Sequence, residues 1–478
     1  MPDGLPNGRP NVAEVVLPAI RWNPERGYEG ERPAIERALA AGVGGFILFG
    51  GEREATRALT AELRSASARP LLIASDLERG AGQQVKGLTQ LPPLMALAAL
   101  GLDAVREAAR ITARESRDVG INWALAPVCD LDIEPANPIV QTRAFGADAF
   151  EVAEQAAAWI DACQSAGVLA CAKHFPGHGR TTTDSHAELP VVSAGRELER
   201  DLMPFRRAVV AGVAGVMTAH VAYPAWDPLG VPATCSRVLL SDLLRRDLFF
   251  TGLTVTDALI MEGALSGQSE AQGAVRALSA GCDLLLYPKD LGAVVTALRA
   301  AAEPKDGIGA HVARAAWRRA DAARRALAPQ PLSHGDAHAL KERGEAIALA
   351  ALKLQRGDLK SVRRAVTIEI VDDDVGGPYP LPPRTAFGDE LTRLGVEQRP
   401  RGERVVLLFA DVKGWKGRSG LSDTSARRLT TLAAGRTPVV VFGHPRRVSD
   451  VPGEGPVLCA WSGDEVMQRA AARRFAQA

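Results

Sequence analysis

Three of the chain's eight histidines lie in one stretch, which reads Lys173-His174-Phe175-Pro176-Gly177-His178-Gly179 and continues to Asp184-Ser185-His186. An apolar run at residues 168–172 precedes it and predicts a buried strand. Its proline and glycine residues exclude a regular helix directly after that strand. The stretch is therefore predicted to be a long loop at the C-terminal end of a strand, a common place for catalytic residues.

Two carboxylates in the sequence are placed for acid/base and nucleophilic chemistry. Asp184 lies two residues from His186, and a carboxylate bonded to an imidazole fixes its tautomer and raises its basicity near neutral pH. Asp257 leaves an apolar segment at residues 253–256, where a low dielectric and a fixed orientation suit a nucleophile. The alternative for Asp257 is a cap of the next helix.

An aspartate nucleophile with a nearby proton donor is the apparatus of retaining glycoside hydrolysis, which usually uses two carboxyl groups about 5 Å apart. Here the donor would be a histidine. Lys173 and His174, at the strand end, are suited to donate hydrogen bonds to sugar hydroxyls. Metal binding by the loop is the competing interpretation, but the spacing of its histidines fits no standard zinc motif, so no metal is expected.

The rest of the first 300 residues alternates short β-rich runs with helical patterns. The runs cover residues 14–20, 45–49, 71–75, 123–127, 169–172, 215–219, 253–256 and 283–287. The helical patterns cover residues 32–41, 54–66, 104–119, 150–166, 197–211, 241–248, 270–280 and 291–302. Eight such alternations predict an α/β fold of the (β/α)8 TIM-like barrel type.

In such a barrel the active site lies at the C-terminal ends of the strands. Polar residues follow five of the predicted strands: Asp76 and Glu78, Asp130, Lys173 and His174, His220, and Asp257. All of them are expected to face one mouth. For any single one of them, a helix N-cap is the alternative role.

The remainder of the chain predicts a second, smaller α/β domain. A helix at residues 311–328 is followed by a proline-rich linker at 329–335. Helices are then expected at 336–354, 387–394, 425–434 and 464–475, and strands at 365–371, 404–409, 438–442 and 456–460. We therefore predict a barrel domain over residues 1–328 and an α/β domain with a mostly parallel sheet over residues 336–478. His444 near a strand end is predicted to be structural.

Composition restricts the partners. Charged residues make up 24% of the chain and the formal net charge is +1, which argues against nucleic-acid or membrane-surface binding and favours a small-molecule partner. The six cysteines form no CxxC pair, so free thiols are expected. No secretory h-region or long apolar run is present, and a cytoplasmic location is expected. The oligomeric state is not indicated.

The loop signature resembles that of the family 3 glycoside hydrolases of the bacterial β-N-acetylglucosaminidase type. Three further segments are similar to family motifs: Ser75-Asp76-Leu77-Glu78-Arg79-Gly80 to the substrate-aspartate motif, Thr142-Arg143-Ala144-Phe145-Gly146 to the arginine loop, and residues 255–263 to the nucleophile motif. The resemblance covers roughly residues 10–325. The trailing part resembles, in shortened form, the α/β sandwich domain of two-domain members.

The resemblance implies roles for individual residues. Asp257 would be the nucleophile that forms a glycosyl-enzyme, His186 the acid/base and Asp184 its partner. The implied ligands of the terminal sugar are Asp76, Arg143, Lys173 and His174. No metal or organic cofactor is implied, and the substrate would be a small glycoside or a muropeptide.

Two features bear on specificity. In the family's glucosidase branch the acid/base is a glutamate of the second domain, so the Asp-Ser-His loop favours the N-acetylglucosaminidase branch. Gln84 stands where the family usually has a second arginine, and an amide cannot make the same forked, charged contact. A β-glucosidase specificity therefore stays open.

Two other functions are compatible with the same residues. Phosphate could replace water, giving a phosphorylase, because a deprotonated histidine is neutral and would not repel a phosphate dianion. A non-catalytic sugar-binding protein on the same scaffold is the third alternative, against which stand the intact nucleophile and acid/base motifs.

Overall fold

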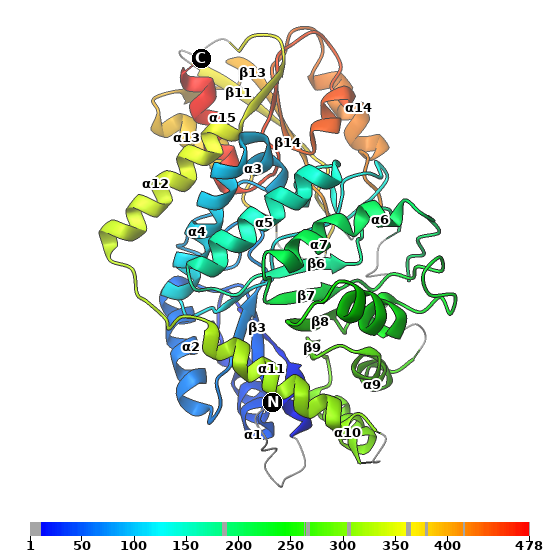
Figure 1. Ribbon diagram of the computed structural model, residues 1–478. Coiled ribbons are helices and arrows are strands. Elements are labelled where there is room, and N and C mark those ends of the chain that lie inside the picture. The colour runs from blue at the N-terminus through cyan, green and yellow to red at the C-terminus, as the bar shows by residue number, and fades with distance from the viewer. Residues whose placement is uncertain are drawn as a thin grey trace.

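The computed structural model describes residues 11–183, 189–261, 263, 268–303, 307–359, 365–377, 381–413 and 416–477. The first 300 residues form two parallel sheets wrapped by helices, with strand orders β2-β3-β4-β5 and β1-β9-β8-β7-β6 (Figure 1). Their strands are β1 Val16–Leu17, β2 Ala19–Arg21, β3 Gly45–Phe49, β4 Leu72–Ser75, β5 Trp123–Ala124, β6 Cys171–Phe175, β7 Gly215–Thr218, β8 Leu253–Ala258 and β9 Leu284–Leu286. Each predicted run thus contains a strand.

A single closed eight-stranded barrel, as predicted, is not confirmed, because the backbone ladders divide into two sheets. Pro18 separates β1 from β2, and Pro127 follows β5. Proline has no N–H to donate to a ladder. Isolated bridges between Trp123 and Leu169 and between Val128 and Lys173 join the two sheets on the other side. The fold is therefore a parallel α/β structure with its two sheets side by side.

Helices cover the outer faces of both sheets. They are α1 Arg32–Ala41, α2 Arg53–Ala66, α3 Leu94–Leu100, α4 Leu102–Asp118, α5 Ala149–Ser165, α6 Leu198–Asp201, α7 Met203–Val210, the π-helical η6 Val238–Asp247, α9 Glu270–Ala280, α10 Leu291–Ala302 and α11 Gly309–Arg325. Local capping explains several starts: the Asp148 side chain accepts from two N–H groups of α5, and Ser269 with Gln272 forms a capping box on α9. One continuous apolar core joins strands and helices.

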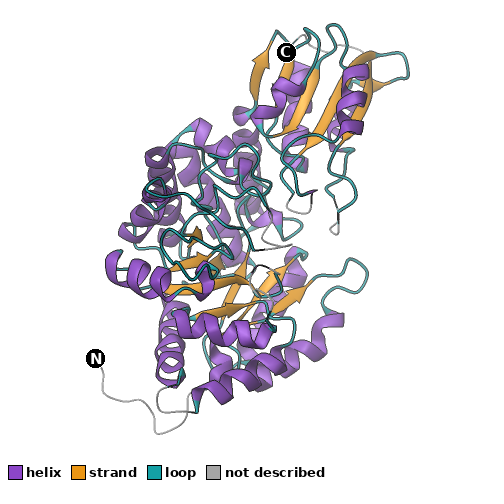
Figure 2. Cartoon of the chain, turned by 90° about the vertical axis from the view of Figure 1, so that its right-hand side faces the viewer, coloured by secondary structure: helices purple, strands orange, loops and turns teal. Residues whose placement is uncertain are grey.

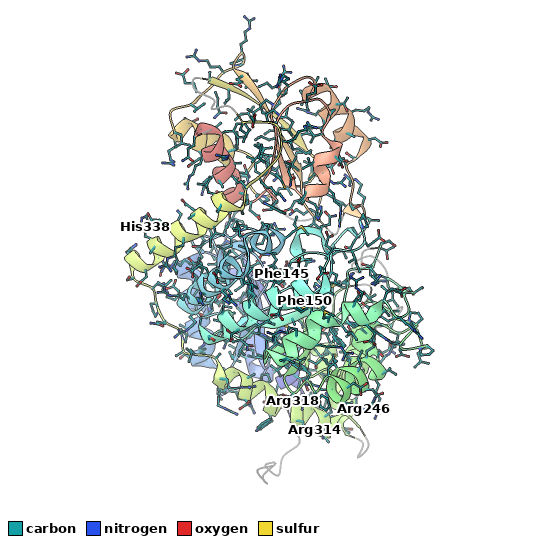
Figure 3. All side chains as sticks on the ribbon, turned by 45° about the horizontal axis from the view of Figure 1, so that its top comes forward. Phe145, Phe150, Arg246, Arg314, Arg318 and His338 are labelled. Carbon is teal, nitrogen blue, oxygen red and sulfur yellow. The ribbon has the colours of Figure 1, made fainter. Side chains whose placement is uncertain are left out.

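A buried charge cluster fastens α11 to the N-terminal end of the five-stranded sheet. Asp283, fully buried just before β9, receives Arg245 Nη2 and Arg318 Nη2, each at 2.5 Å, and the backbone N–H of Thr254 at 3.0 Å. Figure 3 labels Arg318 on α11. Because this end is opposite to the strand ends that carry Lys173 and Asp257, the cluster stabilises the fold rather than the chemistry.

A third sheet of six strands follows, with the order β10-β15-β14-β13-β11-β12. It comprises β10 Lys353–Arg356, β11 Ala365–Asp372, β12 Glu397–Gln398, β13 Glu403–Ala410, β14 Val439–Gly443 and β15 Val457–Cys459, and only β10 pairs antiparallel. Side chains alternate across it: Val405 and Leu407 pack with helices α13 Ala386–Arg393 and α15 Glu465–Gln477, whereas Val406 and Leu408 pack with α14 Asp423–Leu432. Figure 2 shows this sheet at one end of the molecule.

One helix links the two parts. Helix α12, His334–Ala351, packs against α3 and α4 of the first part and against α15 of the second (Figure 1). Its predicted end at residue 354 is wrong, because residues 353–356 form β10, which pairs with β15. The sequence also did not predict α3 or β12.

The cysteines and the lengths of the helices can be compared with the expectations from the sequence. All six cysteines are free thiols, and five of them are buried. Among the described residues, no helix combines the length and the apolar character needed to cross a bilayer.

Candidate active site

Strand ends from both sheets meet at Lys173. Its backbone lies within β6, and its carbonyl accepts from Cys129 N–H at 2.6 Å. Its Nζ lies 2.8 Å from Asp76 Oδ1 and 2.7 Å from Glu78 Oε1, both in the loop after β4 of the other sheet. Side chains that follow strands of both sheets therefore meet at Lys173.

Arg143 belongs to the same cluster through Glu78. Its Nε and Nη2 donate to the two oxygens of Glu78 at 2.9 and 2.8 Å, a forked contact. Burial would raise the pKa of Glu78, but Arg143 and Lys173 hold it well below its usual range. Side-chain exposure is 29% for Asp76 and 21% for Arg143, against 3% for Lys173. Asp76 and Arg143 are thus the most solvent-exposed side chains of the cluster.

His174 is oriented by Asp130. Nδ1 of His174 lies 2.7 Å from Asp130 Oδ2, and the backbone N–H groups of His174 and His178 donate to Oδ1 at 3.1 and 2.7 Å. This arrangement assigns a proton to Nδ1 and presents Nε2 to the site. Burial would raise the pKa of Asp130, but His174 and His178 lower it.

Asp257 lies near the end of β8, with its side chain 22% exposed. His174 Nε2 is 4.0 Å from its Oδ2, and the Ala258 N–H donates to its Oδ1 at 2.8 Å. Burial would raise the pKa of Asp257, but nearby His174, His220 and Lys173 and the Ala258 N–H lower it to about 2. Asp257 is therefore an ionised, accessible carboxylate at neutral pH.

The structure thus brings together most of the predicted site residues. Asp76, Arg143 and Lys173 share one charge network, and His174 adjoins Asp257. Asp184 and His186 lie outside the described residues, so the predicted acid/base pair stays a prediction.

Glu78 and Asp130 were expected at strand ends, but without a role of their own: Glu78 joins Lys173 to Arg143, and Asp130 holds His174. Each follows a predicted strand, which was the available signal.

The site is rich in negative charge. Four carboxylates and two permanent cations converge: Asp76, Glu78, Asp130 and Asp257, with Arg143 and Lys173. Such a site disfavours anionic groups at its centre and favours a group that carries or develops positive charge. Among the described residues, no group of three or more His, Cys, Asp or Glu side chains could hold a metal ion.

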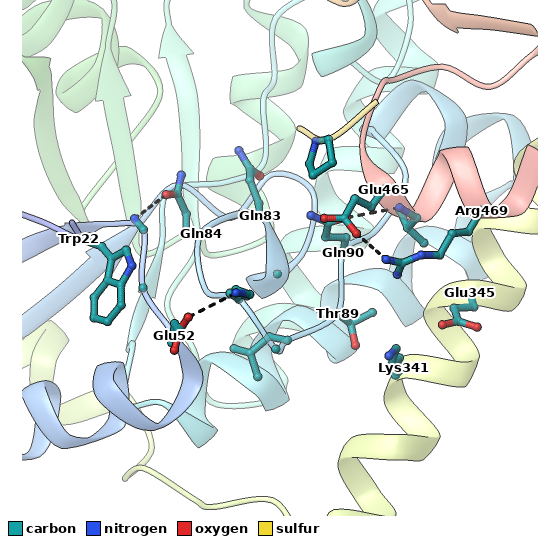
Figure 4. A pocket seen from close by; sticks show the side chains of 18 of the residues that line it. Trp22, Glu52, Gln83, Gln84, Thr89, Gln90, Lys341, Glu345, Glu465 and Arg469 are labelled. Carbon is teal, nitrogen blue, oxygen red and sulfur yellow. Dashed lines mark hydrogen bonds and ion pairs between the residues drawn. The ribbon is translucent and has the colours of Figure 1, made fainter. Parts of the chain in front are cut away.

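A separate cavity of about 700 Å³ lies between the ends of β2 and β3 and helices α12 and α15 (Figure 4). Gln84 lines it, and its Oε1 accepts from the Gly50 N–H at 3.0 Å. Neither Asp257 nor Lys173 lines this cavity. Gln84, which stands where the family usually has a second arginine, is thus bonded to the backbone of Gly50.

Comparisons with known proteins agree with this geometry. Residues 29–318 match the family model described as the glycosyl hydrolase family 3 N terminal domain. The chain is 41% identical over 261 residues to a β-N-acetylglucosaminidase/β-glucosidase from Cellulomonas fimi, covering 52% of this chain and 46% of the relative. It is 39% identical over 261 residues to a β-hexosaminidase from Nitrosomonas eutropha, covering 52% of this chain and 74% of that relative.

Among solved structures, a glycoside hydrolase family 3 β-N-acetylglucosaminidase from Paenibacillus sp. str. FPU-7 aligns with a TM-score of 0.84 and 29% identity, covering 98% of this chain and 96% of that one. The similarity therefore includes the third sheet as well as the first two.

Proposed function

Since this chain belongs to glycoside hydrolase family 3, we propose that it is an exo-acting, retaining β-N-acetylglucosaminidase that removes terminal β-linked N-acetylglucosamine. The observation that carries the proposal is Asp257, an accessible carboxylate with a pKa of about 2, fixed at a strand end beside His174. Relatives with hexosaminidase activity in their names support the choice of sugar.

In the proposed mechanism, Asp257 attacks the anomeric carbon and forms a glycosyl-aspartate. The expelled oxygen takes a proton from His186, which Asp184 orients. The neutral imidazole then removes a proton from water, whose oxygen attacks the anomeric carbon and releases Asp257 as a carboxylate. Each turnover returns both groups to their starting protonation states.

Binding of the terminal sugar is assigned to Asp76, Arg143, Lys173 and His174. Asp76 accepts from sugar hydroxyls, and the exposed part of Arg143 donates to the sugar. Lys173 and Glu78 beneath them are mostly buried and hold both groups in place. Lys173 is paired with Asp76 and Glu78, and Arg143 with Glu78, before the ligand arrives, which lowers the ordering cost of binding.

We also propose a division into two domains, a substrate class and a location for the protein. Residues 1–328 form the catalytic domain, with a barrel-like arrangement of both sheets, and residues 336–478 form the second domain. The substrate is a small glycoside or muropeptide rather than a nucleic acid or a membrane. The protein acts in the cytoplasm, which cell fractionation would test.

The test compares an aryl β-N-acetylglucosaminide with the matching aryl β-glucoside, with and without phosphate, and identifies the sugar product. We expect faster turnover of the N-acetylglucosaminide, with free N-acetylglucosamine as product in both buffers. A 2-fluoro glycosyl reagent should label Asp257, and Asp257→Ala should lower kcat/KM by roughly 10³-fold or more.

Each alternative has its own outcome in this test. A sugar 1-phosphate formed only in phosphate would identify a phosphorylase. Preferred turnover of the glucoside would identify a β-glucosidase, in line with the double name of the Cellulomonas fimi relative. Activity unchanged in Asp257→Ala would overturn the mechanism, and binding of the sugar without turnover would identify a non-catalytic protein.

A further inference from the structure

In the third sheet the order of the strands changes direction at the neighbouring strands β11 and β13. From β11 the chain passes to β12 on one side, whereas β13 lies on the other side of β11. Open parallel sheets bind their ligands at such a point, outside the carboxyl ends of the strands. Here it is lined by Asp374, two residues after β11, and Asp411, directly after β13, whose N–H donates to Asp374 at 3.0 Å.

A side chain from the first part of the molecule reaches these strand ends. Arg79 Nη1 lies 3.1 Å from Asp411 Oδ2 and 2.8 Å from Asp464 Oδ2. The side chains of Arg79 and Asp411 are 12% and 3% exposed. Buried charges of this kind are stable only when their partners are present, so removing either side leaves an uncompensated charge. Figure 2 shows the sheet seated over the loops of the other two.

Arg79 is part of the loop that carries the sugar-binding carboxylates. It lies three residues after Asp76 and next to Glu78, both of which pair with Lys173. Its backbone is fixed as well, since the Gln83 side chain accepts from its N–H at 2.7 Å and its carbonyl accepts from Leu91 at 2.9 Å. Arg79 thus ties the short segment that carries Asp76 and Glu78 to the second domain through its side chain, in addition to these backbone bonds.

A second contact of the same kind reaches the neighbouring loop. Asp132, two residues after Asp130, is buried and receives Arg446 Nη2 at 2.6 Å and His444 Nε2 at 2.9 Å. His444, which the sequence predicted to be structural, thus joins the third sheet to the loop that orients His174. Two of the loops beside the site, those that follow β4 and β5, are thus held by residues of the second domain.

We propose that Arg79 is a positioning residue, through which Asp411 and Asp464 hold Asp76 and Glu78 in the geometry that binds the sugar. The second domain then affects catalysis without contacting the substrate, because its strand ends bind Arg79 of the loop that carries Asp76 and Glu78. This role rests on the proposed function, because the loss is read in turnover of the glycoside.

The experiment compares Arg79→Gln, Arg79→Lys and Asp464→Asn with Arg473→Gln in the full chain. Arg473 is a matched control, since it also lies between two carboxylates, Glu345 at 2.8 Å and Glu390 at 2.6 Å, but its partners are on helices α12 and α13 and not on a loop that carries site residues. The readouts are kcat and KM on the aryl N-acetylglucosaminide, thermal stability, and amide hydrogen exchange of residues 76–90.

For Arg79→Gln we expect kcat/KM to fall about 10- to 100-fold, mainly through KM, because a misplaced binding group weakens a pre-organised site. Exchange over residues 76–90 should become at least about ten-fold faster. Arg79→Lys and Asp464→Asn should lose less, since each keeps part of the charge pairing, and they serve if Arg79→Gln does not fold. Arg473→Gln should lose stability but keep kcat and KM.

Three results are decisive. Unchanged kcat/KM and exchange in all Arg79 and Asp464 variants would overturn the inference. An equal loss of kcat/KM in Arg473→Gln would also overturn it, because the effect would then be one of general stability. Faster exchange in the Arg79 variants with a wild type inactive on the glycoside would refute the proposed function and leave the positioning of the loop supported.

Discussion

Asp130 carries three contacts on two oxygens, and all of them serve the segment that ends in His174 and His178. A carboxylate suits this position because both of its oxygens accept hydrogen bonds. Its negative charge favours the tautomer of His174 that carries a proton on Nδ1, facing Asp130. The result is an imidazole whose free nitrogen has a fixed position, 4.0 Å from Asp257.

Asp130→Asn should separate this role from plain packing. The amide has one acceptor oxygen for three donors, so a buried N–H is left without a partner and His174 loses its orientation. We expect kcat/KM to fall about 10²-fold. The measurement is steady-state kinetics together with thermal unfolding. Asp227→Asn is the control, since Asp227 is also buried and accepts from Ser236 Oγ at 2.6 Å; an equal loss there would contradict the orienting role.

The site residues show what a sequence predicts and where it stops. Strand ends indicated Asp76, Lys173, His174 and Asp257, because a residue that follows a parallel strand lies at the same edge as the residues that follow its neighbours. Arg143 was indicated only by the family motif. Their pairings could not be predicted, because Arg143 lies 65 positions from Glu78 and His174 lies 44 positions from Asp130. Only the assembled sheets bring such pairs together.

At the scale of elements, helical spacing predicted α1, α9 and α10 with their observed bounds. The prediction failed where an element depends on a distant partner. Strand β10 has no strand pattern of its own and forms because it pairs with β15, about a hundred residues later. Helix α12 had to end earlier for that pairing, which a local pattern does not record.

The packing of α12 predicts an unusual response to Gly344→Ala. Alanine in a helix is normally more stable than glycine by about 1 kcal/mol, but a Cβ at Gly344 would lie 2.3 Å from Thr89 Cγ2. Thr89 is buried and β-branched, so overpacking should cost about 1–3 kcal/mol and reverse the sign. Gly335→Ala, on the same helix with its nearest neighbour at 3.9 Å, should be neutral or stabilising. Urea unfolding of both variants is the test, and a stabilised Gly344→Ala would contradict the close contact.

For the molecule as a whole, buried carboxyl groups set how stability changes with pH. Glu115 of α4 accepts from the N–H and the hydroxyl of Thr89 at 2.9 and 2.7 Å. Burial raises its pKa from 4.5 to about 7, against the lowering effect of these bonds and of Arg53. The folded state therefore holds this proton more tightly than the unfolded state.

The sign of the effect follows. The stabilising contribution of protonated Glu115 is complete below pH 4.5 and is lost as the pH rises through about 7. At 1.36 kcal/mol per unit, the loss is at most roughly 3 kcal/mol. In Glu115→Gln the amide oxygen can accept from the Thr89 N–H and the amide NH2 can donate to the Thr89 hydroxyl, so both contacts remain and the group does not titrate. The difference in melting temperature between this variant and the wild type should therefore shift in favour of the variant as the pH rises from 5 to 8. Parallel melting curves across that range would refute the assignment.

Lys173 belongs to both halves of the scaffold at once, with its backbone bonded beside β5 and β6 and its ammonium group on the loop after β4. In a saturation library, position 173 should therefore be depleted under selection for abundance as well as under selection for turnover. Position 257 should be depleted under turnover alone. Loss of activity in a Lys173 variant would therefore not show that Lys173 binds the sugar, because the same residue also joins the two sheets.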